Sequence, residues 1–485
     1  MTDVLSVASE CAPLIKTGGL ADVVGALPSA LMQEGLRMRV LIPGYPAVMA
    51  QLSETRSVLE DPDLFGGAAR VLAAEAADLD LLVLDAPHLY DRPGGPYIDE
   101  SGADWPDNPE RFAALSWIAA RIGLEGVTDA QAEGGTWRPE VLQCHDWQAA
   151  LAPEYVHAMG GTGKVGTIVT IHNIAFQGLA EASRLSALRL PPERFTPDGF
   201  EFWGRISALK AGLTSADRLT TVSPTYAAEL MRDDYGGGLD GLLRSRRDHL
   251  SGILNGIDET VWNPATDEHI NRTYRSARGK APNTAALRGA MGLPEAEGPL
   301  CVCVTRLTEQ KGIDLLIEAL PRLLRRGGQL ALLGSGEARF EDALREMAER
   351  EPNLAVQIGY DEVLAHRLIA GGDAILVPSR FEPCGLTQLY ALRYGTVPLV
   401  AMTGGLADTV INANAAALDR GVATGVQFHP VIAETFGVAI DQLCDLYARS
   451  DLWGQLQRNA MRQPVGWGPS AQAYAALFRE VAPAA

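Results

Sequence analysis

Short apolar segments alternate with amphipathic segments along most of the chain, and this alternation limits the folds that the chain can adopt. In the first half, the segments that resemble buried strands are 4–8, 39–42, 81–84, 141–144, 167–171 and 219–222. The same pattern restarts in the second half, at 300–304, 330–333, 355–358, 374–377 and 397–400. Strands that alternate with helices favour a doubly wound parallel sheet. The sequence therefore predicts an α/β protein with two such sheets.

A polar stretch, residues 263–298, separates the two series of predicted strands. It contains prolines and mixed charges but no predicted strand, and we interpret it as the crossover and early helices of a second lobe. With 485 residues, the chain is too long for one ordinary core. We expect a first lobe over 1–255, a second over 256–465 and a final segment over 466–485. An amphipathic helix in that final segment is compatible with either lobe.

The composition argues against several classes of protein. A formal net charge of −19 disfavours a nucleic acid or an anionic membrane as a partner. No segment has the length of a transmembrane helix, and the N-terminal residues lack the basic and apolar regions of a signal peptide. Six cysteines in a chain of this length predict no disulfide framework, and no Cys and His spacing resembles a zinc site. We therefore expect a reduced, cytoplasmic protein.

The hexapeptide Thr-Gly-Gly-Leu-Ala-Asp occurs twice, at 17–22 and at 403–408, and each copy opens a predicted helix. A Gly-Gly turn at a helix start lets backbone N–H groups approach an anion, and the helix dipole adds positive charge there. We expect the two copies to serve one negatively charged ligand, although two unrelated turns have the same sequence pattern. Lys16 precedes the first copy, whereas Met402 precedes the second.

Polar residues follow many of the predicted strands, at the carboxyl ends where open α/β sheets bind ligands. In chain order they are Glu10, Lys16, Gly18, Gly19 and Asp22, then His145, Asp146 and Trp147, then His172 and Asn173, then Arg306 and Lys311, and finally Glu382, Cys384 and Gly385. These residues form the predicted active site.

Each of these groups has a functional and a structural interpretation. Arg306 and Lys311 together suit a departing diphosphate, but the same spacing fits a solvated helix start equally well. Glu382 suits hydrogen bonds to sugar hydroxyls, or it caps a helix. A lone histidine such as His172 is more often structural. The aromatic residues that could stack on sugar rings are favoured as core: Trp147, Trp203 and Tyr97.

Seven sequence runs, in order and over nearly the whole chain, resemble bacterial glycogen synthases and plant starch synthases. They are KTGGLADVVGALP from Lys16, HDWQ from His145, TIHNIAFQG from Thr170, SPTYA from Ser223, ILNGID from Ile253, TRLTEQKGIDLL from Thr305 and SRFEPCGLTQLYALRYGT from Ser379. Together these motifs are far more specific than any single glycine loop. The length and the lack of a leading transit segment favour the bacterial group.

The resemblance implies a retaining glucosyltransferase of the GT-B type, with two Rossmann-like lobes facing across a deep interdomain cleft. Such an enzyme transfers glucose from ADP-glucose to the non-reducing end of an α-1,4-glucan, here glycogen, and releases ADP. The resemblance implies that no metal is required. It also implies no cofactor, since ADP-glucose is a substrate. The final helix in this fold crosses back to the first lobe.

The resemblance also implies roles for individual residues. The residues expected to take part in catalysis are Lys16, His172, Arg306, Lys311 and Glu382. Those expected to bind the donor are Gly18, Gly19, Asp22, Asp146, Asn173, Asn255, Tyr360, Cys384, Gly385, Leu386, Thr387, Thr403, Gly404 and Gly405. Within that set, Tyr360 is expected near the adenine. Glu10 and Tyr97 are expected on the acceptor side.

Two alternatives remain open from the sequence. The same fold can use UDP-glucose or another acceptor, because the side chains that read the base are not revealed by spacing. A non-catalytic glucan-binding protein derived from such an enzyme predicts damage to the charged set, yet Lys16, Arg306, Lys311 and Glu382 are all present. Some related two-lobed enzymes carry a second glutamate eight residues after Glu382. The residue there is Tyr390, as expected for the bacterial glycogen synthase group.

Overall fold

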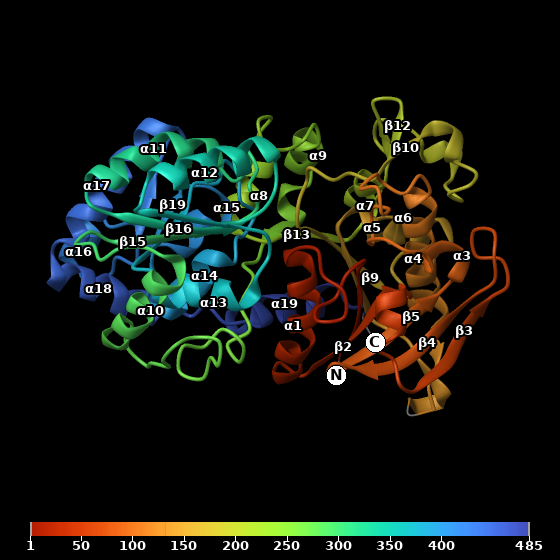
Figure 1. The fold of residues 1–485 in the computed structure, drawn as a ribbon. Coiled ribbons are helices and arrows are strands. Elements are labelled where there is room, and N and C mark those ends of the chain that lie inside the picture. The colour runs from red at the N-terminus through yellow and green to blue at the C-terminus, as the bar shows by residue number, and fades with distance from the viewer. Residues whose placement is uncertain (1, 131, 484–485) are drawn as a thin grey trace. The chain divides into compact units, whose positions relative to one another are not determined.

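The computed structural model describes residues 2–130 and 132–483, and the chain divides into two compact units (Figure 1). Unit 1 contains the described residues up to Val222, Ala227–Ile253 and the residues from Trp467 onward. Unit 2 contains Ser223–Tyr226 and Leu254–Gly466. The division therefore falls two residues before the expected boundary at 255, and the short segment Ser223–Tyr226 groups with unit 2.

Unit 1 is built on a nine-stranded sheet with the order β14-β13-β9-β8-β1-β2-β5-β4-β3. The strands that pair in parallel are β1 (Thr2–Val7), β2 (Leu36–Pro43), β5 (Leu79–Asp85), β8 (Val141–His145), β9 (Gly166–Ile171), β13 (Arg218–Thr221) and β14 (Leu250–Gly252). β4 (Ala69–Ala76) and β3 (Thr55–Asp61) extend the sheet as an antiparallel edge. All six strands predicted in this half form, and β3, β4 and β14 are additional.

Helices and two small sheets complete unit 1. The helices are α1 (Gly19–Gln33), α2 (Pro46–Met49), α3 (Pro87–Tyr90), α4 (Asn108–Glu125), α5 (Asp146–Ala149), α6 (Leu151–Ala158), α7 (Ala208–Ser215), α9 (Asp240–Ser245) and α19 (Gly468–Val481). The small sheets are β10 (Leu179–Glu181), β12 (Arg205–Ser207) and β11 (Glu201–Phe202), and the pair β6 (Val127–Thr128) and β7 (Thr136–Trp137). α8 (Pro224–Leu230) begins in unit 2 and ends in unit 1.

The final helix α19 belongs to the core of unit 1. Its buried side chains Tyr474 and Phe478 pack in one cluster with Val23 and Leu27 of α1 and with Val4 of β1. At the helix end, Arg479 donates a hydrogen bond to the Glu34 carbonyl. Burial of an apolar face is the main stabilising contribution to such a helix. α19 is therefore an integral part of unit 1, although it comes last in the chain.

Unit 2 is built on a six-stranded parallel sheet, drawn in green to blue in Figure 1. Its strands are β15 (Leu300–Val304), β16 (Gln329–Gly334), β17 (Leu354–Ile358), β18 (Ala374–Val377), β19 (Val397–Ala401) and β20 (Val426–Phe428). The order β17-β16-β15-β18-β19-β20 is the 3-2-1-4-5-6 order of a Rossmann fold. All five strands predicted in this half form, and β20 is additional.

The helices of unit 2 cover this sheet. They are α10 (Ala281–Met291), α11 (Ile313–Arg325), α12 (Ala338–Arg350), α13 (Glu362–Gly371), α14 (Thr387–Tyr394), α15 (Gly404–Thr409), α16 (Ala415–Asp419), α17 (Ala433–Tyr447) and α18 (Ser450–Ala460). α11 shows why they form: Ile313, Leu316, Leu320 and Leu323 recur at helical spacing, and all are fully buried. In residues 2–130 and 132–483, no helix combines the length and apolar character needed to cross a membrane.

Candidate active site

The strand order of each sheet reverses at one point, and the candidate site residues follow the strands on either side of it. In unit 1 the reversal lies between β1 and β8, which precede Glu10 and Asp146. In unit 2 it lies between β15 and β18, which precede Lys311 and Glu382. Because crevices for ligands open at such switch points, each unit has the topology for a binding site where the predicted residues lie.

In unit 1, Glu10 holds together two segments of the predicted site. Its buried carboxylate accepts a hydrogen bond of 2.7 Å from the Thr17 hydroxyl, and it also accepts from the Thr17 N–H and the Tyr97 hydroxyl. Burial, followed by the charge of Glu10, raises the pKa of Tyr97 well above its usual value. Tyr97 is therefore a neutral donor to Glu10, and Glu10 fixes the start of the first hexapeptide.

The first hexapeptide presents an accessible cation beside a helix start. The Lys16 ammonium lies 2.8 Å from the Asp22 carboxylate, and its side chain is 44% exposed. Gly18 precedes the first residue of α1, and a Cβ atom there would meet nothing within 4 Å. The space beside Gly18 is thus open, and α1 is long enough for its N-terminus to favour an anion.

Asp146 is held in a strained but well-bonded position at the end of β8. Its backbone adopts a φ of 53°, a conformation that Asp tolerates better than most residues. Its carboxylate accepts the N–H groups of His172 at 2.7 Å and Asn173 at 3.3 Å. Burial nevertheless raises the pKa of Asp146 to about 7, since its effect exceeds that of the two N–H donors. Asp146 therefore titrates near neutral pH.

His145 is among the polar residues predicted to follow a strand, but the resemblance assigns it no role, and the sequence does not predict its contacts. Its ring joins the Ser6 hydroxyl at 3.0 Å to the His172 ring at 2.9 Å. Burial lowers the pKa of both rings, that of His172 to about 3, so both are neutral at physiological pH. The register of β8 and β9, which sets His145 opposite Thr170, is what brings the two histidines together. Asn173 shapes the following turn by accepting the Ala175 N–H at 3.0 Å.

In unit 2, Lys311 and Glu382 form an ion pair. The Lys311 ammonium lies 2.5 Å from a Glu382 carboxylate oxygen that also accepts a hydrogen bond from Ser379 at 3.0 Å. The two side chains are only 16% and 10% exposed, so water screens the pair weakly. Arg306 is exposed and has no ion-pair partner among the described residues. Unit 2 therefore has one paired cation, Lys311, and one cation without an ion-pair partner, Arg306, after the same strand β15.

The second hexapeptide is used differently from the first. The Gly405 N–H donates to the carbonyls of Glu382 and Pro383, both at 3.1 Å. A Cβ atom would lie 1.9 Å from the Glu382 oxygen at Gly404, and 2.2 Å from the Cys384 oxygen at Gly405. The two glycines thus permit close backbone packing against the loop that carries Glu382. The expectation that both copies present free amides to an anion is wrong for Gly405, and α15, which Thr403 precedes, has only six residues.

The loop after Glu382 is also tied to Asn255. Burial raises the pKa of the Cys384 thiol to about 12, although the Asn255 backbone bonds to it, so Cys384 is not a nucleophilic thiolate. The side-chain oxygen of Asn255 is buried and has no hydrogen-bond partner among the described residues. Gly385 has a φ of 74°, and Leu386 and Thr387 begin α14. An unpaired buried acceptor beside a helix start is suited to a polar ligand.

The aromatic candidates have different environments. Trp147 packs edge-on against Phe112 with ring centroids 5.0 Å apart, as a core residue does. Trp203 is 85% exposed, so its interpretation as core is wrong; it lies on a hairpin tip that the sequence pattern does not identify. Tyr360 follows β17, is 83% exposed and bonds to Glu362. Tyr390 stacks on Trp262 at 3.8 Å.

Residues 2–130 and 132–483 contain no group of three His, Cys, Asp or Glu side chains arranged to hold a metal ion. All six cysteines are unpaired and buried. The candidate cation of unit 1 is Lys16, and those of unit 2 are Arg306 and Lys311.

The chain matches known sequence families and relatives over nearly its full length. The family described as starch synthase catalytic domain matches residues 3–245, and the family of glycosyl transferases group 1 matches residues 292–459. The chain is 59% identical over 482 residues to the glycogen synthase of Paracoccus denitrificans strain Pd 1222, covering 99% of this chain and 100% of the relative. Its identity to the glycogen synthase of Jannaschia sp. strain CCS1 is also 59%, with the same coverage.

Solved structures agree with these matches. The catalytic domain of starch synthase IV from Arabidopsis thaliana, bound to ADP and acarbose, superposes with a TM-score of 0.87 at 31% identity over 99% of both chains. A sucrose-phosphate synthase from Thermosynechococcus elongatus shares the fold at 18% identity, with a TM-score of 0.59. With the strand order of each unit, these matches confirm the predicted α/β class with two Rossmann-like domains of the GT-B type.

Proposed function

Because the chain belongs to the glycogen and starch synthase family of glycosyltransferases, we propose that it transfers glucose from ADP-glucose to the non-reducing end of an α-1,4-glucan and releases ADP. The donor follows from the ADP found in the related starch synthase IV, and the acceptor from the glycogen synthases that share more than half of its residues. The proposed partners are therefore ADP-glucose and glycogen, with no nucleic acid and no membrane.

The observation that carries this proposal is the ion pair of Lys311 and Glu382 at the switch point of unit 2. When the bond between glucose and the diphosphate breaks, negative charge grows on the departing phosphate. The Lys311 ammonium and the Arg306 guanidinium are the groups proposed to stabilise it. The Glu382 carboxylate positions Lys311 before the donor binds and accepts hydrogen bonds from glucose hydroxyls.

In unit 1, Lys16 and the amides after Gly18 and Gly19 are proposed to contact donor phosphates. His172 is neutral, because burial lowers its pKa to about 3, so it acts as a hydrogen-bonding group on glucose rather than as a cation. Its ring is oriented by His145, and Asp146 fixes the backbone beside it. Glu10 positions the first hexapeptide, and Tyr97 bonds to it on the proposed acceptor side.

The proposed reaction retains the configuration at C1. The bond from C1 to the diphosphate oxygen breaks first, C1 gains oxocarbenium character, and the acceptor hydroxyl attacks from the same face. The hydroxyl proton passes to the departing phosphate oxygen, so the products are the extended glucan and ADP. The protein contributes orientation and stabilisation of the leaving group. No metal is proposed, because cationic side chains can supply the charge that a metal would otherwise provide.

We propose the cytoplasm as its location, because six buried, unpaired cysteines suit a reducing compartment.

One assay tests the proposal directly: release of ADP from ADP-glucose by the purified chain with glycogen as acceptor. Turnover that depends on glycogen supports it. The same assay with UDP-glucose tests the choice of base, and a higher kcat/KM with UDP-glucose contradicts the proposed donor. Glycogen binding without release of either nucleotide would instead identify a non-catalytic glucan-binding protein.

A further inference from the structure

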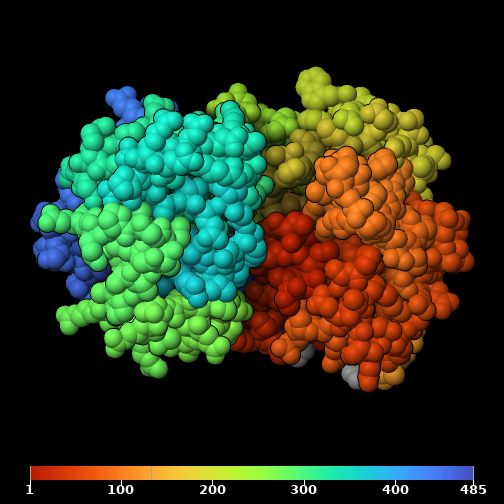
Figure 2. Space-filling view, viewed as in Figure 1, coloured from red at the N-terminus to blue at the C-terminus, as the bar shows by residue number. Residues whose placement is uncertain are grey.

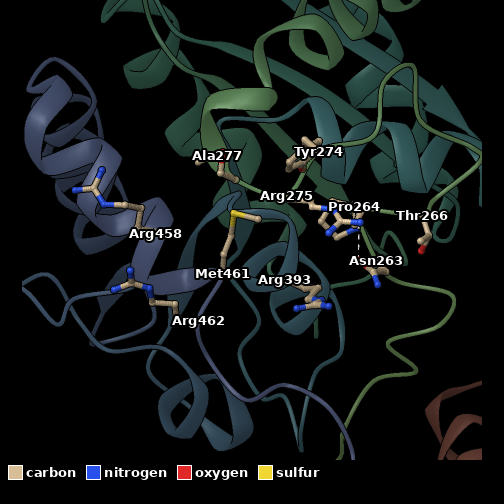
Figure 3. A pocket seen from close by; sticks show the side chains of 12 residues that line it. Asn263, Pro264, Thr266, Tyr274, Arg275, Ala277, Arg393, Arg458, Met461 and Arg462 are labelled. Atoms are coloured by element: carbon tan, nitrogen blue, oxygen red, sulfur yellow. Dashed lines mark hydrogen bonds between the residues drawn. The ribbon is translucent and has the colours of Figure 1, made fainter.

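Unit 2 contains a cavity of about 580 Å³ that is separate from the candidate active site. Four arginines line it, Arg275, Arg393, Arg458 and Arg462, and we call it the arginine pocket. Figure 3 shows Arg458 and Arg462 on one side, Arg275 and Arg393 on the other, and Met461 between them. Part of its wall comes from the segment before α10, which is light green on the surface of unit 2 in Figure 2.

The arginine pocket lies on the side of the unit 2 sheet where the strands begin, whereas the candidate site lies on the side where they end. α14 starts at Thr387, beside the loop of Glu382 at the carboxyl end of β18, and ends at Tyr394, just before the amino end of β19. Arg393 is in its last turn, so it is separated from the Glu382 loop by the length of the helix. A ligand in the arginine pocket is therefore distinct from one held by Lys311 and Glu382.

The charges of the arginine pocket are mostly uncompensated. Arg393 forms a loose ion pair with Glu259, whose carboxylate lies 3.6 Å from the Arg393 Nε atom. This Nε is buried and has no hydrogen-bond partner among the described residues. Arg275, Arg458 and Arg462 are exposed, and their side chains have neither a hydrogen bond nor an ion pair to any described residue.

Such an arrangement is unexpected in a chain with 60 acidic and 41 basic residues. Four arginines around one cavity raise the positive potential there, and Glu259 beside Arg393 offsets only part of it. Guanidinium forks bind phosphate oxygens in pairs, which makes phosphate the best-matched anion. The cavity also has apolar walls, from Pro264, Ala277 and Met461, and its volume is that of a site for a small organic molecule.

We propose that the arginine pocket binds a small phosphorylated organic anion that carries at least two negative phosphate charges, of the size of a sugar bisphosphate. The phosphates pair with Arg275, Arg458 and Arg462, and the organic body packs on Met461 and Pro264. This site goes beyond the proposed glucosyl transfer and does not depend on it, because none of its residues belongs to the candidate active site.

Calorimetry with the full chain tests this proposal, with fructose 1,6-bisphosphate as the probe and fructose as its uncharged counterpart. We expect one site for the bisphosphate and none for fructose. Arg458→Gln with Arg462→Gln weakens binding by at least about tenfold, which corresponds to roughly 1.4 kcal/mol. Arg325→Gln is the matched control, because Arg325 is exposed at the end of α11 and lies outside the pocket; its binding stays within about twofold.

Two further arms separate this site from its alternatives. Arg306→Gln alters the candidate active site, so bisphosphate binding that is lost in this variant, or that survives the double substitution, overturns the proposal. Pyrophosphate that binds as tightly as the bisphosphate overturns the role of the apolar wall and identifies a site for inorganic anions. If the double variant does not fold, as judged by circular dichroism, the single change Arg275→Gln replaces it, because Arg275 is exposed on a segment without helix or strand.

Discussion

The Lys311 ammonium lies 2.5 Å from the Glu382 carboxylate, in a site where both side chains are largely removed from water. In this pair each charge is compensated by the other before any donor binds. Loss of the lysine leaves a buried carboxylate without its partner and removes a cation from the proposed leaving group.

Lys311→Gln is expected to lower kcat by at least about two orders of magnitude, a loss typical for removal of a group that stabilises charge in the transition state. The control is Lys164→Gln, which removes an exposed lysine from unit 1 and leaves turnover unchanged. Steady-state rates of ADP release measure both variants. Activity of Lys311→Gln within about tenfold of the parent, roughly 1.4 kcal/mol of barrier, would contradict the leaving-group role.

The two hexapeptides are expected to respond differently to the same glycine-to-alanine substitution. Gly405→Ala places a Cβ atom 2.2 Å from the Cys384 carbonyl, so we expect a loss of about 1–3 kcal/mol in the free energy of unfolding, as for other overpacked sites. Gly18→Ala meets nothing within 4 Å, and its stability should change by no more than about 0.5 kcal/mol. Urea unfolding of both variants checks this, and equal effects would show that the two copies are packed alike.

Asp146→Asn is expected to change the pH dependence of stability. The pKa of Asp146 rises from 3.8 to about 7 on folding, so the folded state holds a proton that the unfolded state loses between these values. Asp146 therefore makes stability fall as pH rises from about 4 to about 7, and its contribution is constant above that range. Asparagine also tolerates the left-handed backbone and can accept the same N–H groups.

The measurement is chemical unfolding of the parent and of Asp146→Asn at about pH 5 and about pH 8. The variant should gain stability relative to the parent at the higher pH. An identical difference at both values would mean that Asp146 is ionised throughout.

Chelation of divalent cations is expected to leave turnover unchanged. Arg306 and Lys311 are proposed to supply the positive charge at the leaving group, so EDTA should not alter the rate of ADP release. Activity that disappears with EDTA and returns with Mg²⁺ would require a metal in the reaction. The two side chains would then contribute less to stabilising the leaving group than we propose.

Phe478→Ala is expected to destabilise unit 1 by about 3–5 kcal/mol, because Phe478 is fully buried in the cluster of α19, α1 and β1. Phe176→Ala is the matched control, since Phe176 is 60% exposed and its loss creates no cavity. Calorimetric unfolding of the two variants compares them directly. A small effect at Phe478 would mean that α19 is held by its ends rather than by its buried face.

The strands that the sequence predicted are those buried on both faces, because such strands are continuous apolar runs. β3 was missed since it is an edge strand whose first three residues are exposed, which gives a weak apolar signal. The site residues that follow strands could be predicted from their position alone. The partners of these residues could not, because contacts such as His145 with His172 depend on the pairing register of two strands.

The duplicated hexapeptide shows a second limit of sequence. Its two copies have identical letters, yet Gly18 faces open space and Gly405 packs against the Cys384 carbonyl. The difference arises from a loop more than fifteen residues earlier in the chain, which no local pattern around Gly405 can indicate. Similarly, the exposure of Trp203 follows from its place on a hairpin tip, and its residue type favours the opposite expectation.

The placement of α19 has a consequence for the order in which the protein is completed. Unit 2 is an insertion within unit 1, since the chain leaves unit 1 after Ile253 and returns at Trp467. During synthesis, all of unit 2 precedes the last helix, so it can reach its final form while unit 1 still lacks part of its core. The apolar surface of Val23 and Leu27 stays uncovered until the final residues emerge. The lobe that is translated first is therefore the one that is finished last.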